Sequence, residues 1–320
     1  MSTIRVGVLR GGPSSEYEVS LKSGAEVLSN LPEQYSGRDI LIDKWGAWHM
    51  DGREQSIDRI LNQVDVIFNA MHGEYGEDGQ VQQILDTHSV PYTGTKAMGS
   101  ALAMNKVLTK QTFEKVGIKT PYYKVLRAAD DIHDQIFHIF RTFPLPAIIK
   151  PIGAGSSVGV TIVRDYNGLE RAVHEVLSRW PEVLIEELIT GKELTCGVLE
   201  NFRDENLYTM LPVEIIPPEK SEFFSADVKY TGETQELCPA RISEKESREI
   251  QEAARIAHEA VHARHYSRTD FILSPRGLYA LEINTHPGLT SESLLPKPLK
   301  AIGCEFPQFL DHVIQEAMSS

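Results

Sequence analysis

Residues 267–284 read SRTDFILSPRGLYALEIN, and this stretch decides how the last third of the chain folds. It contains two strand-like runs, 267–274 and 278–284, which are rich in apolar and β-branched residues. Between them lies Pro275-Arg276-Gly277, whose proline and glycine favour a turn. We therefore expect an antiparallel hairpin centred on Arg276.

One face of this hairpin is expected to be polar. Pairing about the turn sets Asp270 opposite Glu282, and it sets Arg268 opposite Asn284. Because successive side chains of a strand point to opposite faces, these four share one face. The other face is expected to be apolar and to hold Phe271, Leu273, Tyr279, Leu281 and Ile283.

Two carboxylates and a carboxamide on one patch form a set of hard oxygen donors. They are too few to enclose Ca²⁺, but they suit Mg²⁺, which completes its shell with waters and substrate phosphates. A solvated polar strand face explains the same residues. Arg268 fits either interpretation, as a salt-bridge partner or as a cation in a phosphate site.

Length, charge and cysteine content narrow the class of protein. The chain has 320 residues, enough for about two domains or three small ones. Its net charge of -13 repels nucleic acid and anionic lipid, so neither is an expected partner. The cysteines form no C-x-x-C pair and indicate neither a disulfide framework nor a zinc site. Neither a signal peptide nor a membrane-spanning apolar stretch is apparent, so we expect a soluble, cytoplasmic protein.

The first hundred residues favour a parallel sheet of the βαβ type. Three strands and one helix are expected, at residues 4–9, 40–42, 64–68 and 18–31. In such sheets ligands bind beyond the carboxyl ends of the strands. Two loops in that position, 11–18 and 72–79, carry glycines and acidic residues.

The remaining chain predicts further mixed units. A helix and three short strands are expected at residues 105–116, 147–150, 158–163 and 183–187. They are followed by a strand over 208–215, a polar loop over 217–239 and a long helix. Ser243 and, three residues later, Glu246 form a capping box that marks the start of this helix.

A glycine-rich stretch, KPIGAGSSVG at residues 150–159, lies between two expected strands. Its amides suit phosphate oxygens, and Lys150 on the incoming strand supports that interpretation. It is neither a Walker A loop nor a G-x-G-x-x-G motif, and a plain flexible hairpin is the alternative.

Other polar clusters also allow two interpretations. Glu186 and Glu187 end an apolar strand and suit either an adenine and ribose pocket or a simple turn. His72 is either a general base or a buried structural histidine. Lys229-Tyr230 belongs either to a site or to a loop surface.

Eight motifs occur together in a highly specific order: GGPSSEYEVSL (11–21), HGEYGEDG (72–79), PYTG (91–94), MNK (104–106), the stretch 150–159, KY (229–230), RTD (268–270) and EINTHPGLTS (282–291). Through them the chain resembles the D-alanine–D-alanine ligases of the ATP-grasp superfamily along essentially its whole length. One stretch, FFSA at 223–226, departs from the family's tyrosine- and aspartate-containing pattern.

The resemblance implies an α/β fold with α+β elements, built as a three-domain ATP-grasp protein whose first domain has a parallel sheet. The expected domain limits are 1–103, 104–188 and 189–320. ATP would lie between the second and third domains, and two D-alanine molecules would lie under loops of all three. A homodimer is also expected.

The resemblance implies roles around the nucleotide. Two Mg²⁺ ions, which Mn²⁺ can replace, would be held by Asp270, Glu282 and Asn284. The phosphates would be contacted by Lys106, Lys150, Lys229 and the Ser156-Ser157 loop. Adenine and ribose would be surrounded by Glu186, Glu187, Ile189 and Glu193.

It also implies roles around the amino acids. Glu16 would pair with the first ammonium group, in a network with Ser156 and Tyr230. His72 would lie near this first D-alanine. The carboxylate of the second would be contacted by Ser293 and Leu294, and the oxyanion of the reaction would be stabilised by Arg268 and the Gly288 N–H.

The implied reaction joins two D-alanine molecules through an acyl phosphate, releasing ADP and phosphate, for peptidoglycan precursor synthesis. One alternative is an ATP-grasp ligase for another carboxylate and amine. Tyr230 argues for an amine over a hydroxy acid as second substrate and leaves D-serine open. The other alternative is a non-catalytic nucleotide-binding protein, against which the intact set on the hairpin argues.

Overall fold

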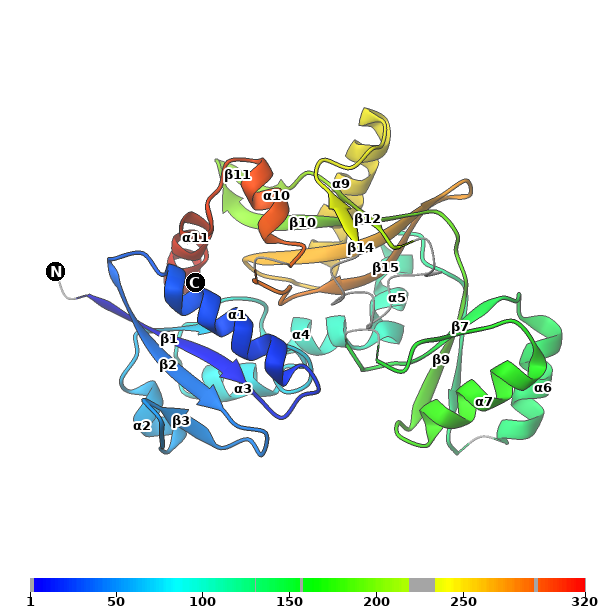
Figure 1. Ribbon diagram of the computed structural model, residues 1–320, viewed down its shortest axis with the longest axis horizontal. Coiled ribbons are helices and arrows are strands. Elements are labelled where there is room, and N and C mark those ends of the chain that lie inside the picture. The colour runs from blue at the N-terminus through cyan, green and yellow to red at the C-terminus, as the bar shows by residue number, and fades with distance from the viewer. Residues whose placement is uncertain (1–2, 130, 156–157, 219–233, 291–292, 320) are drawn as a thin grey trace.

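The structure is a computed structural model that describes residues 3–129, 131–155, 158–218, 234–290 and 293–319. Three sheets with flanking helices make up this part of the chain, as Figure 1 shows. The expected mixture of α/β and α+β elements is confirmed.

The first sheet has the strand order β4-β3-β2-β1-β5. Its strands are β1 (Ile4–Gly11), β2 (Tyr35–Ile42), β3 (Trp48–Met50), β4 (Arg53–Glu54) and β5 (Val66–Asn69). β1 runs parallel to β2 and to β5, which confirms the expected parallel part. β3 and β4 add an antiparallel edge that the sequence did not predict, since a short turn lets the chain return beside β2. The accompanying helices are α1 (Tyr17–Asn30), α2 (Ile57–Leu61) and α3 (Gln80–Thr87).

The second sheet is antiparallel, with the order β6-β9-β7-β8. Its strands are β6 (Tyr123–Arg127), β7 (Ala147–Pro151), β8 (Thr161–Val163) and β9 (Glu182–Glu187). The apolar sides of α6 (Ile132–Thr142) and α7 (Tyr166–Leu177) pack on it. The glycine-rich stretch joins β7 to β8, so its expected hairpin position is confirmed.

The third sheet has the order β13-β12-β10-β14-β15, with β11 beside β10. Its strands are β10 (Lys192–Phe202), β11 (Glu205–Thr209), β12 (Val213–Ile216), β13 (Gln235–Leu237), β14 (Tyr266–Ser274) and β15 (Gly277–Asn284). The single strand expected over 208–215 is wrong, because the chain forms two strands there. Pro212, which has no N–H to donate, lies between them.

The hairpin β14–β15 has the predicted register only at the end remote from its turn. Asp270 pairs with Glu282 and Arg268 pairs with Asn284, as expected, but a bulge follows Asp270. On the turn side of the bulge, Phe271 pairs with Ala280. The extra residue is Leu281, and it shifts the alternation of β15 by one.

This bulge corrects part of the predicted apolar face. Phe271 and Ile283 lie in the core under α9 (Glu244–Ala260), as expected. Tyr279 and Leu281 were expected there as well, and this is wrong, since both pack with Ile272 on the opposite side. The predicted face assumed an unbroken alternation, which the bulge interrupts.

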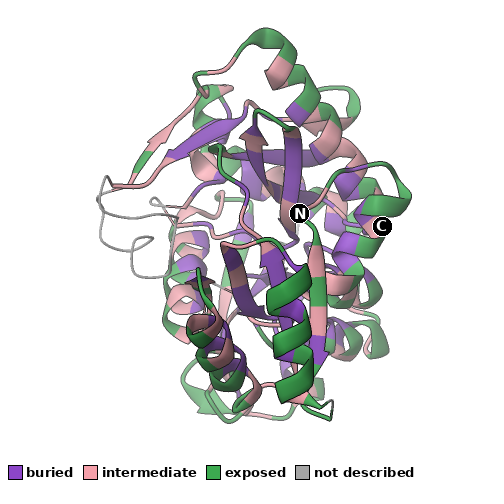
Figure 2. Cartoon of the chain, turned by 90° about the vertical axis from the view of Figure 1, so that its right-hand side faces the viewer, coloured by how far each residue is buried: buried purple, intermediate pink, exposed green. Residues whose placement is uncertain are grey.

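The long helix begins where the capping box predicted. The Ser243 hydroxyl accepts from the Glu246 N–H, and the Glu246 carboxylate accepts from the Ser243 N–H. Figure 2 shows the outcome of this kind of packing: the strands are largely buried, whereas the helices are exposed on their outer sides.

Four more helices connect or cover the sheets: α4 (Ala97–Met104), α5 (Lys106–Lys115), α10 (Pro296–Ala301) and α11 (Phe306–Ser319). α5 contacts α9 and β15, which places its first turn between the second and third sheets. α11, from the end of the chain, lies beside α1 and contacts β5 of the first sheet (Figure 1).

Candidate functional site

A pocket of about 310 Å³ lies between the second and third sheets. Apolar side chains of its wall include Ile189, Ile272 and Leu281. Its polar lining includes Lys106, Lys150, Glu186, Glu187, Glu193, Asp270 and Glu282. The pocket thus brings together predicted nucleotide residues that the sequence scatters over two sheets and a helix.

A buried carboxylate between two lysines forms one wall of this pocket. Glu186 on β9 places Oε2 2.5 Å from Lys150 Nζ on β7, and its Oε1 pairs with Lys110 Nζ on α5. Burial raises the pKa of Glu186, but the two ammonium groups outweigh it, so the pKa lies below its usual value. Glu186 therefore stays ionised and holds Lys150 in place.

Lys106, at the start of α5, bridges the glycine-rich stretch and the hairpin. Its Nζ donates to Ala154 O at 2.7 Å and lies 3.6 Å from Glu282 Oε2. Burial and the charge of Lys150 lower the pKa of Lys106, while Glu282 opposes them. The side-chain amide of Asn105 caps α5 by accepting from two N–H groups of its first turn, so it does not compete for the groups that Lys106 contacts.

The polar face of the hairpin is preorganised by its own hydrogen bonds. Arg268 donates to both oxygens of Asp270, through Nε at 2.8 Å and Nη2 at 2.9 Å. Thr195 on β10 donates to Asp270 Oδ1 at 2.7 Å. Asn284 accepts from the His286 N–H at 3.1 Å. The four predicted residues therefore share one face next to the pocket.

Among the described residues, no three histidine, cysteine or acidic side chains gather as a metal site. The hairpin offers a different donor set, two carboxylates and one carboxamide. Such hard oxygen donors fit Mg²⁺ only together with waters and phosphate oxygens. The residues present therefore suit a metal ion that arrives with a nucleotide.

Three more of the predicted nucleotide residues lie at the same pocket. Glu187 pairs with Arg276 of the hairpin turn at 2.7 Å. Ile189 is buried beside Ile272. Glu193 lies at the start of β10 and lines the pocket.

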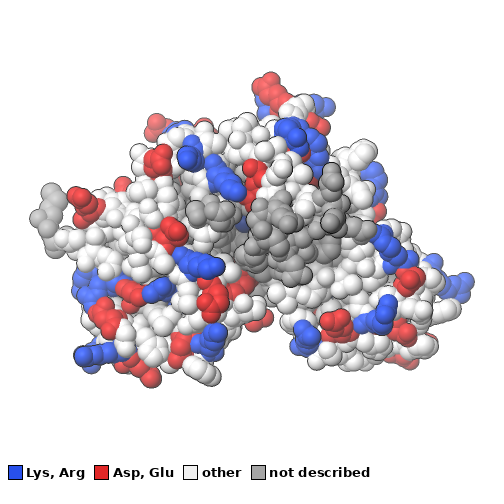
Figure 3. Space-filling model, viewed as in Figure 1, with Lys and Arg blue, Asp and Glu red and all other residues white. Residues whose placement is uncertain are grey.

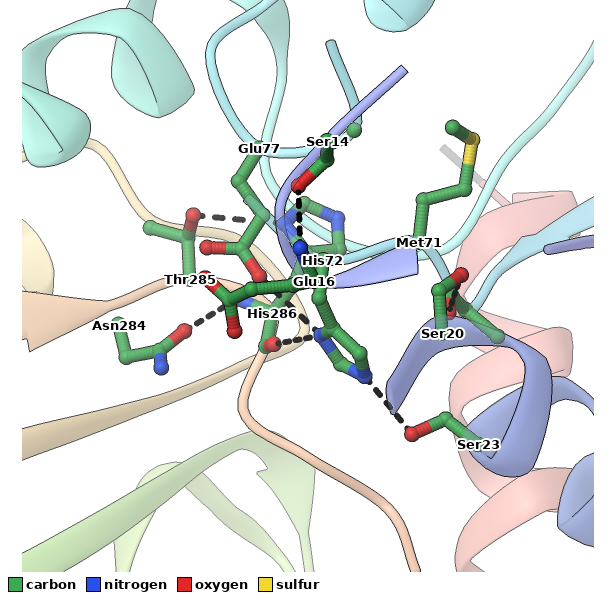
Figure 4. A network of polar contacts seen from close by, with 12 residues as sticks. Ser14, Glu16, Ser20, Ser23, Met71, His72, Glu77, Asn284, Thr285 and His286 are labelled. Carbon is green, nitrogen blue, oxygen red and sulfur yellow. Dashed lines mark hydrogen bonds and ion pairs between the residues drawn. The ribbon is translucent and has the colours of Figure 1, made fainter. Parts of the chain in front are cut away.

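A second polar cluster lies at the carboxyl ends of β1 and β5. Figure 4 shows Glu16, His72 and Glu77 facing Asn284, the last residue of β15, and His286, which follows this strand. His72 Nδ1 lies 3.1 Å from both Glu77 Oε1 and the His286 carbonyl, and its Nε2 lies 2.7 Å from Ser23 Oγ. Both neighbours of Nδ1 are acceptors, so Nδ1 carries a proton.

His286 ties this cluster to the first sheet. Burial lowers its pKa to about 3, so its ring is neutral. Its Nε2 therefore accepts from Asn69 Nδ2, at 3.2 Å. His286, in the loop after β15, is therefore fixed against the end of β5.

Glu16 lies where the first sheet meets the glycine-rich stretch. A Cβ built on Gly155 would overlap Glu16 Oε1, and one built on Gly73 would lie 3.2 Å from the same atom. The predicted neighbour Ser156 follows directly in sequence, but Ser156, Ser157, Lys229 and Tyr230 lie outside the described residues. The expected network of Glu16 with Ser156 and Tyr230 stays a prediction.

The loop after β15 brings Gly288 to Ser293. A Cβ on Gly288 would lie 2.7 Å from Ser293 Oγ, and that hydroxyl accepts from the Thr290 N–H at 3.1 Å. The Leu294 side chain is buried with Val213 and Ile215. Leu294 can therefore offer a ligand its backbone rather than its side chain.

Charged side chains of both signs are spread over the part of the surface that Figure 3 shows. The lysines that line the pocket are buried, with Lys150 8% exposed and Lys106 9% exposed. In the described ranges, no helix has the length and apolarity needed to cross a bilayer.

Comparison with known proteins identifies the family. A model described as "D-ala D-ala ligase C-terminus" matches residues 112–315, and one described as "D-ala D-ala ligase N-terminus" matches residues 52–95. The chain belongs to the D-alanine–D-alanine ligase family. A D-alanine–D-alanine ligase from Syntrophobacter fumaroxidans is 38% identical over 321 residues, covering 99% of both chains.

Solved structures agree with this D-alanine–D-alanine ligase assignment. The VanG D-Ala:D-Ser ligase from Enterococcus faecalis is 30% identical with a TM-score of 0.85, covering 99% of this chain and 100% of that one. A D-alanine–D-alanine ligase from Bacillus anthracis complexed with ATP is 29% identical with a TM-score of 0.81, covering 100% and 98%. The ATP-grasp fold expected from the sequence is thereby confirmed.

The sequence did not predict several side chains that contact the candidate site residues in the structure. Lys110 pairs with Glu186, Thr195 donates to Asp270, and Ser23 and Glu77 contact His72. Only Lys110 had a usable signal, because it follows Lys106 by four positions and so shares its helix face. The other contacts depend on how separate elements pack.

Proposed function

We propose that this protein joins two D-alanine molecules to D-alanyl-D-alanine with ATP, through an acyl phosphate, in peptidoglycan precursor synthesis. The observation that carries the proposal is the placement of the hairpin face beside the lysine-lined pocket. Arg268, Asp270, Glu282 and Asn284 come from β14 and β15, and Lys106 approaches Glu282 from α5. Family membership along the whole chain supports it.

ATP is proposed to occupy the pocket between the second and third sheets. Ile189, Ile272 and Leu281 offer an apolar wall to the adenine ring, and Glu187 and Glu193 lie at the same pocket for its polar edge and the ribose. A nucleotide-sized ligand with an apolar end and a charged end fits this division of residues.

The phosphates are proposed to lie between the lysines and the hairpin. Lys106 and Lys150 supply positive charge there, and the amides of the glycine-rich stretch add donors. We include Ser156, Ser157 and Lys229 in this site from the family pattern. Because the chain carries a net charge of -13, these buried cations have to reverse the local field.

Two Mg²⁺ ions, replaceable by Mn²⁺, are proposed for the hairpin face. Asp270, Glu282 and Asn284 would hold them. When bound, they neutralise charge on the phosphoryl group that is transferred. Glu282 is 39% exposed at its side chain, so one carboxylate is accessible for this role.

The reaction needs two steps because a carboxylate does not react directly with an amine. Oxide cannot leave when an amine attacks, so the γ-phosphoryl of ATP is first transferred to the carboxylate of the first D-alanine, giving an acyl phosphate and ADP. Glu16 is proposed to hold the ammonium group of that D-alanine, with Ser156, Tyr230 and His72 nearby. The amine of the second D-alanine, once deprotonated, then attacks the acyl carbon.

The second step passes through a tetrahedral oxyanion. Arg268 is fixed by Asp270, and the Gly288 N–H lies in the adjoining loop; both are proposed to stabilise this oxyanion. Phosphate then leaves and a peptide bond remains. Ser293 and the backbone at Leu294 are proposed to bind the second carboxylate.

The same proposal covers location and assembly. We propose that the protein is a cytoplasmic homodimer and that each chain has three domains, at residues 1–103, 104–188 and 189–320. Strands β1 to β5, β6 to β9 and β10 to β15 fall within these three ranges in turn.

The test is phosphate release that depends on D-alanine, measured on the wild type and on Glu282→Gln. We expect turnover by the wild type and a loss of at least about tenfold in kcat/KM for the variant, because a donor carboxylate becomes a neutral amide. Glu205→Gln, an exposed carboxylate on β11, is the matched control and should keep wild-type activity.

A panel of D- and L-amino acids separates the neighbouring activities. Turnover that needs D-serine beside D-alanine would assign a mixed ligase, the activity named for one structural relative. Turnover that ignores D-alanine would refute the proposal. ATP binding with no turnover for any amino acid would assign a non-catalytic protein.

A further inference from the structure

Lys110 is a fully buried lysine that the reaction described above does not use. It lies on α5, one turn after Lys106, and its side chain is 0% exposed. Its Nζ pairs with Glu186 Oε1 and donates to Thr120 Oγ1 at 2.6 Å. An ammonium group is costly to bury, so a partner and a reason for its charge are expected.

The partner of Lys110 is also the partner of Lys150. Glu186 offers one oxygen to each lysine, Oε1 to Lys110 and Oε2 to Lys150. β7 and β9 are neighbouring strands, so Lys150 and Glu186 are held side by side by the sheet. Lys110 reaches the same carboxylate from the helix.

This sharing leaves Lys150 able to serve a second ligand. An ammonium group has three donors, and Lys150 lines the pocket while it contacts Glu186. If Lys110 were neutral, Glu186 Oε1 would become an unpaired buried charge. Lys150 would then be drawn toward both oxygens of Glu186, in competition with a phosphate.

We propose that Lys110 is a positioning residue for the nucleotide: it neutralises Glu186 so that Lys150 can bind an ATP phosphate. The inference rests on the proposed function, in which Lys150 contacts phosphate. Lys110 itself does not touch the substrate in this account.

The charge state of Lys110 fits this role. Burial lowers its pKa to about 8, and Glu186 opposes that fall. Lys110 is therefore charged at neutral pH, as the neutralisation of Glu186 requires.

The experiment compares Lys110→Met with Lys115→Met, an exposed lysine on the same helix. Binding of Mg·AMP-PNP to the full-length protein is measured by calorimetry, and KM is measured for ATP and for D-alanine. We expect Kd for Mg·AMP-PNP and KM for ATP to rise by about tenfold or more in Lys110→Met, the loss of a charge-assisted contact. KM for D-alanine and all constants of Lys115→Met should stay at their wild-type values.

A rescue variant separates positioning from a purely structural role. In Lys110→Met/Glu186→Gln the carboxylate that competes for Lys150 is gone, and glutamine keeps an acceptor oxygen. Because Glu186 itself lines the pocket, Glu186→Gln alone is the reference, and the double variant should bind Mg·AMP-PNP as tightly as that single variant. A double variant that binds clearly more weakly than Glu186→Gln, or a Lys110→Met protein that binds like Lys115→Met, overturns the proposal.

Two further outcomes are also decisive. If Lys110→Met does not fold, the comparison of Lys110→Met/Glu186→Gln with Glu186→Gln decides by their affinities. If the wild type binds Mg·AMP-PNP but releases no phosphate with D-alanine, the proposed function fails, and the binding series still accepts or rejects the role of Lys110.

Discussion

The absence of a side chain at Gly155 leaves room for the Glu16 carboxyl group, although the two residues lie in loops of different sheets. Both atoms that a Cβ on Gly155 would approach within 4 Å belong to the Glu16 carboxyl group. The end of a flexible side chain can rotate away, so the fold would survive an added methyl group. What would change is the position of the carboxylate.

Gly155→Ala is therefore expected to impair binding of the first D-alanine rather than stability. We expect KM for D-alanine to rise by about tenfold, the loss of one charge-assisted contact. The melting temperature should stay near the wild-type value. Initial rates of phosphate release at varied D-alanine give the first quantity, and thermal melting gives the second.

Gly153→Ala is the matched control on the same stretch. A Cβ there would meet no described atom within 4 Å, so this variant should behave like the wild type. Equal KM values for the two alanine variants would show that Glu16 is not confined by Gly155.

At this scale the sequence predicted single residues better than their partners. Lys150 could be found because it precedes a glycine-rich stretch, and Asp270 because it lies opposite Glu282 in a short hairpin. The pairing of Glu186 with Lys110 could not be found, since it requires β9 to lie beside α5. That contact is set by tertiary packing and leaves no local pattern.

At the scale of elements, the bulge in β14–β15 changes which face the residues of β15 present, because an unbroken alternation would put Leu281 on the apolar face. Leu281 lies at the pocket, whereas Leu278, on the turn side of the bulge, is buried in the core under α9. Both are leucines of β15, but only Leu281 lines the pocket.

Leu281→Ala and Leu278→Ala should therefore fail in different ways. Leu281→Ala removes apolar surface from the adenine wall, so we expect KM for ATP to rise several-fold with little loss of stability. Leu278→Ala leaves a core cavity, so we expect a loss of about 2–5 kcal/mol in the free energy of unfolding, with KM for ATP unchanged. Steady-state kinetics and urea unfolding of both variants make the comparison.

The unbroken alternation predicted from the sequence places Leu281 in the core, so it requires a large loss of stability for Leu281→Ala as well. Equal losses of stability would restore it. The capping box at Ser243 was predictable because both of its partners lie within four residues. The bulge was not predictable, because symmetric pairing about the turn assumes that neither strand carries an extra residue.

At the scale of the whole molecule, the end of the chain completes the core of its beginning. α11 supplies Phe309, Leu310, Val313 and Ile314 to the cluster that holds Val6 and Phe68 of the first sheet. Asp311 accepts from the Tyr35 hydroxyl at 2.5 Å, and burial with this carboxylate raises the pKa of Tyr35 to about 12. The first sheet is thus packed against a helix that the chain makes last.

Phe309→Ala tests this arrangement. Phe309 is 0% exposed and packs edge-on against Tyr266, with ring centroids 5.4 Å apart. Removing its ring should lower the free energy of unfolding by about 3–5 kcal/mol, because it leaves a cavity in the apolar cluster that α11 shares with the first sheet. Met318→Ala, on the exposed side of the same helix, should change it by less than about 0.5 kcal/mol.

The same variant also separates stability from nucleotide binding. None of the residues that line the pocket belongs to the α11 cluster, so folded Phe309→Ala should bind Mg·AMP-PNP with wild-type affinity. Urea unfolding gives the stability, and calorimetry below the transition gives the affinity. An unfolding midpoint equal to that of Met318→Ala would mean that α11 does not hold the first sheet, and a loss of affinity would mean that this core positions the pocket.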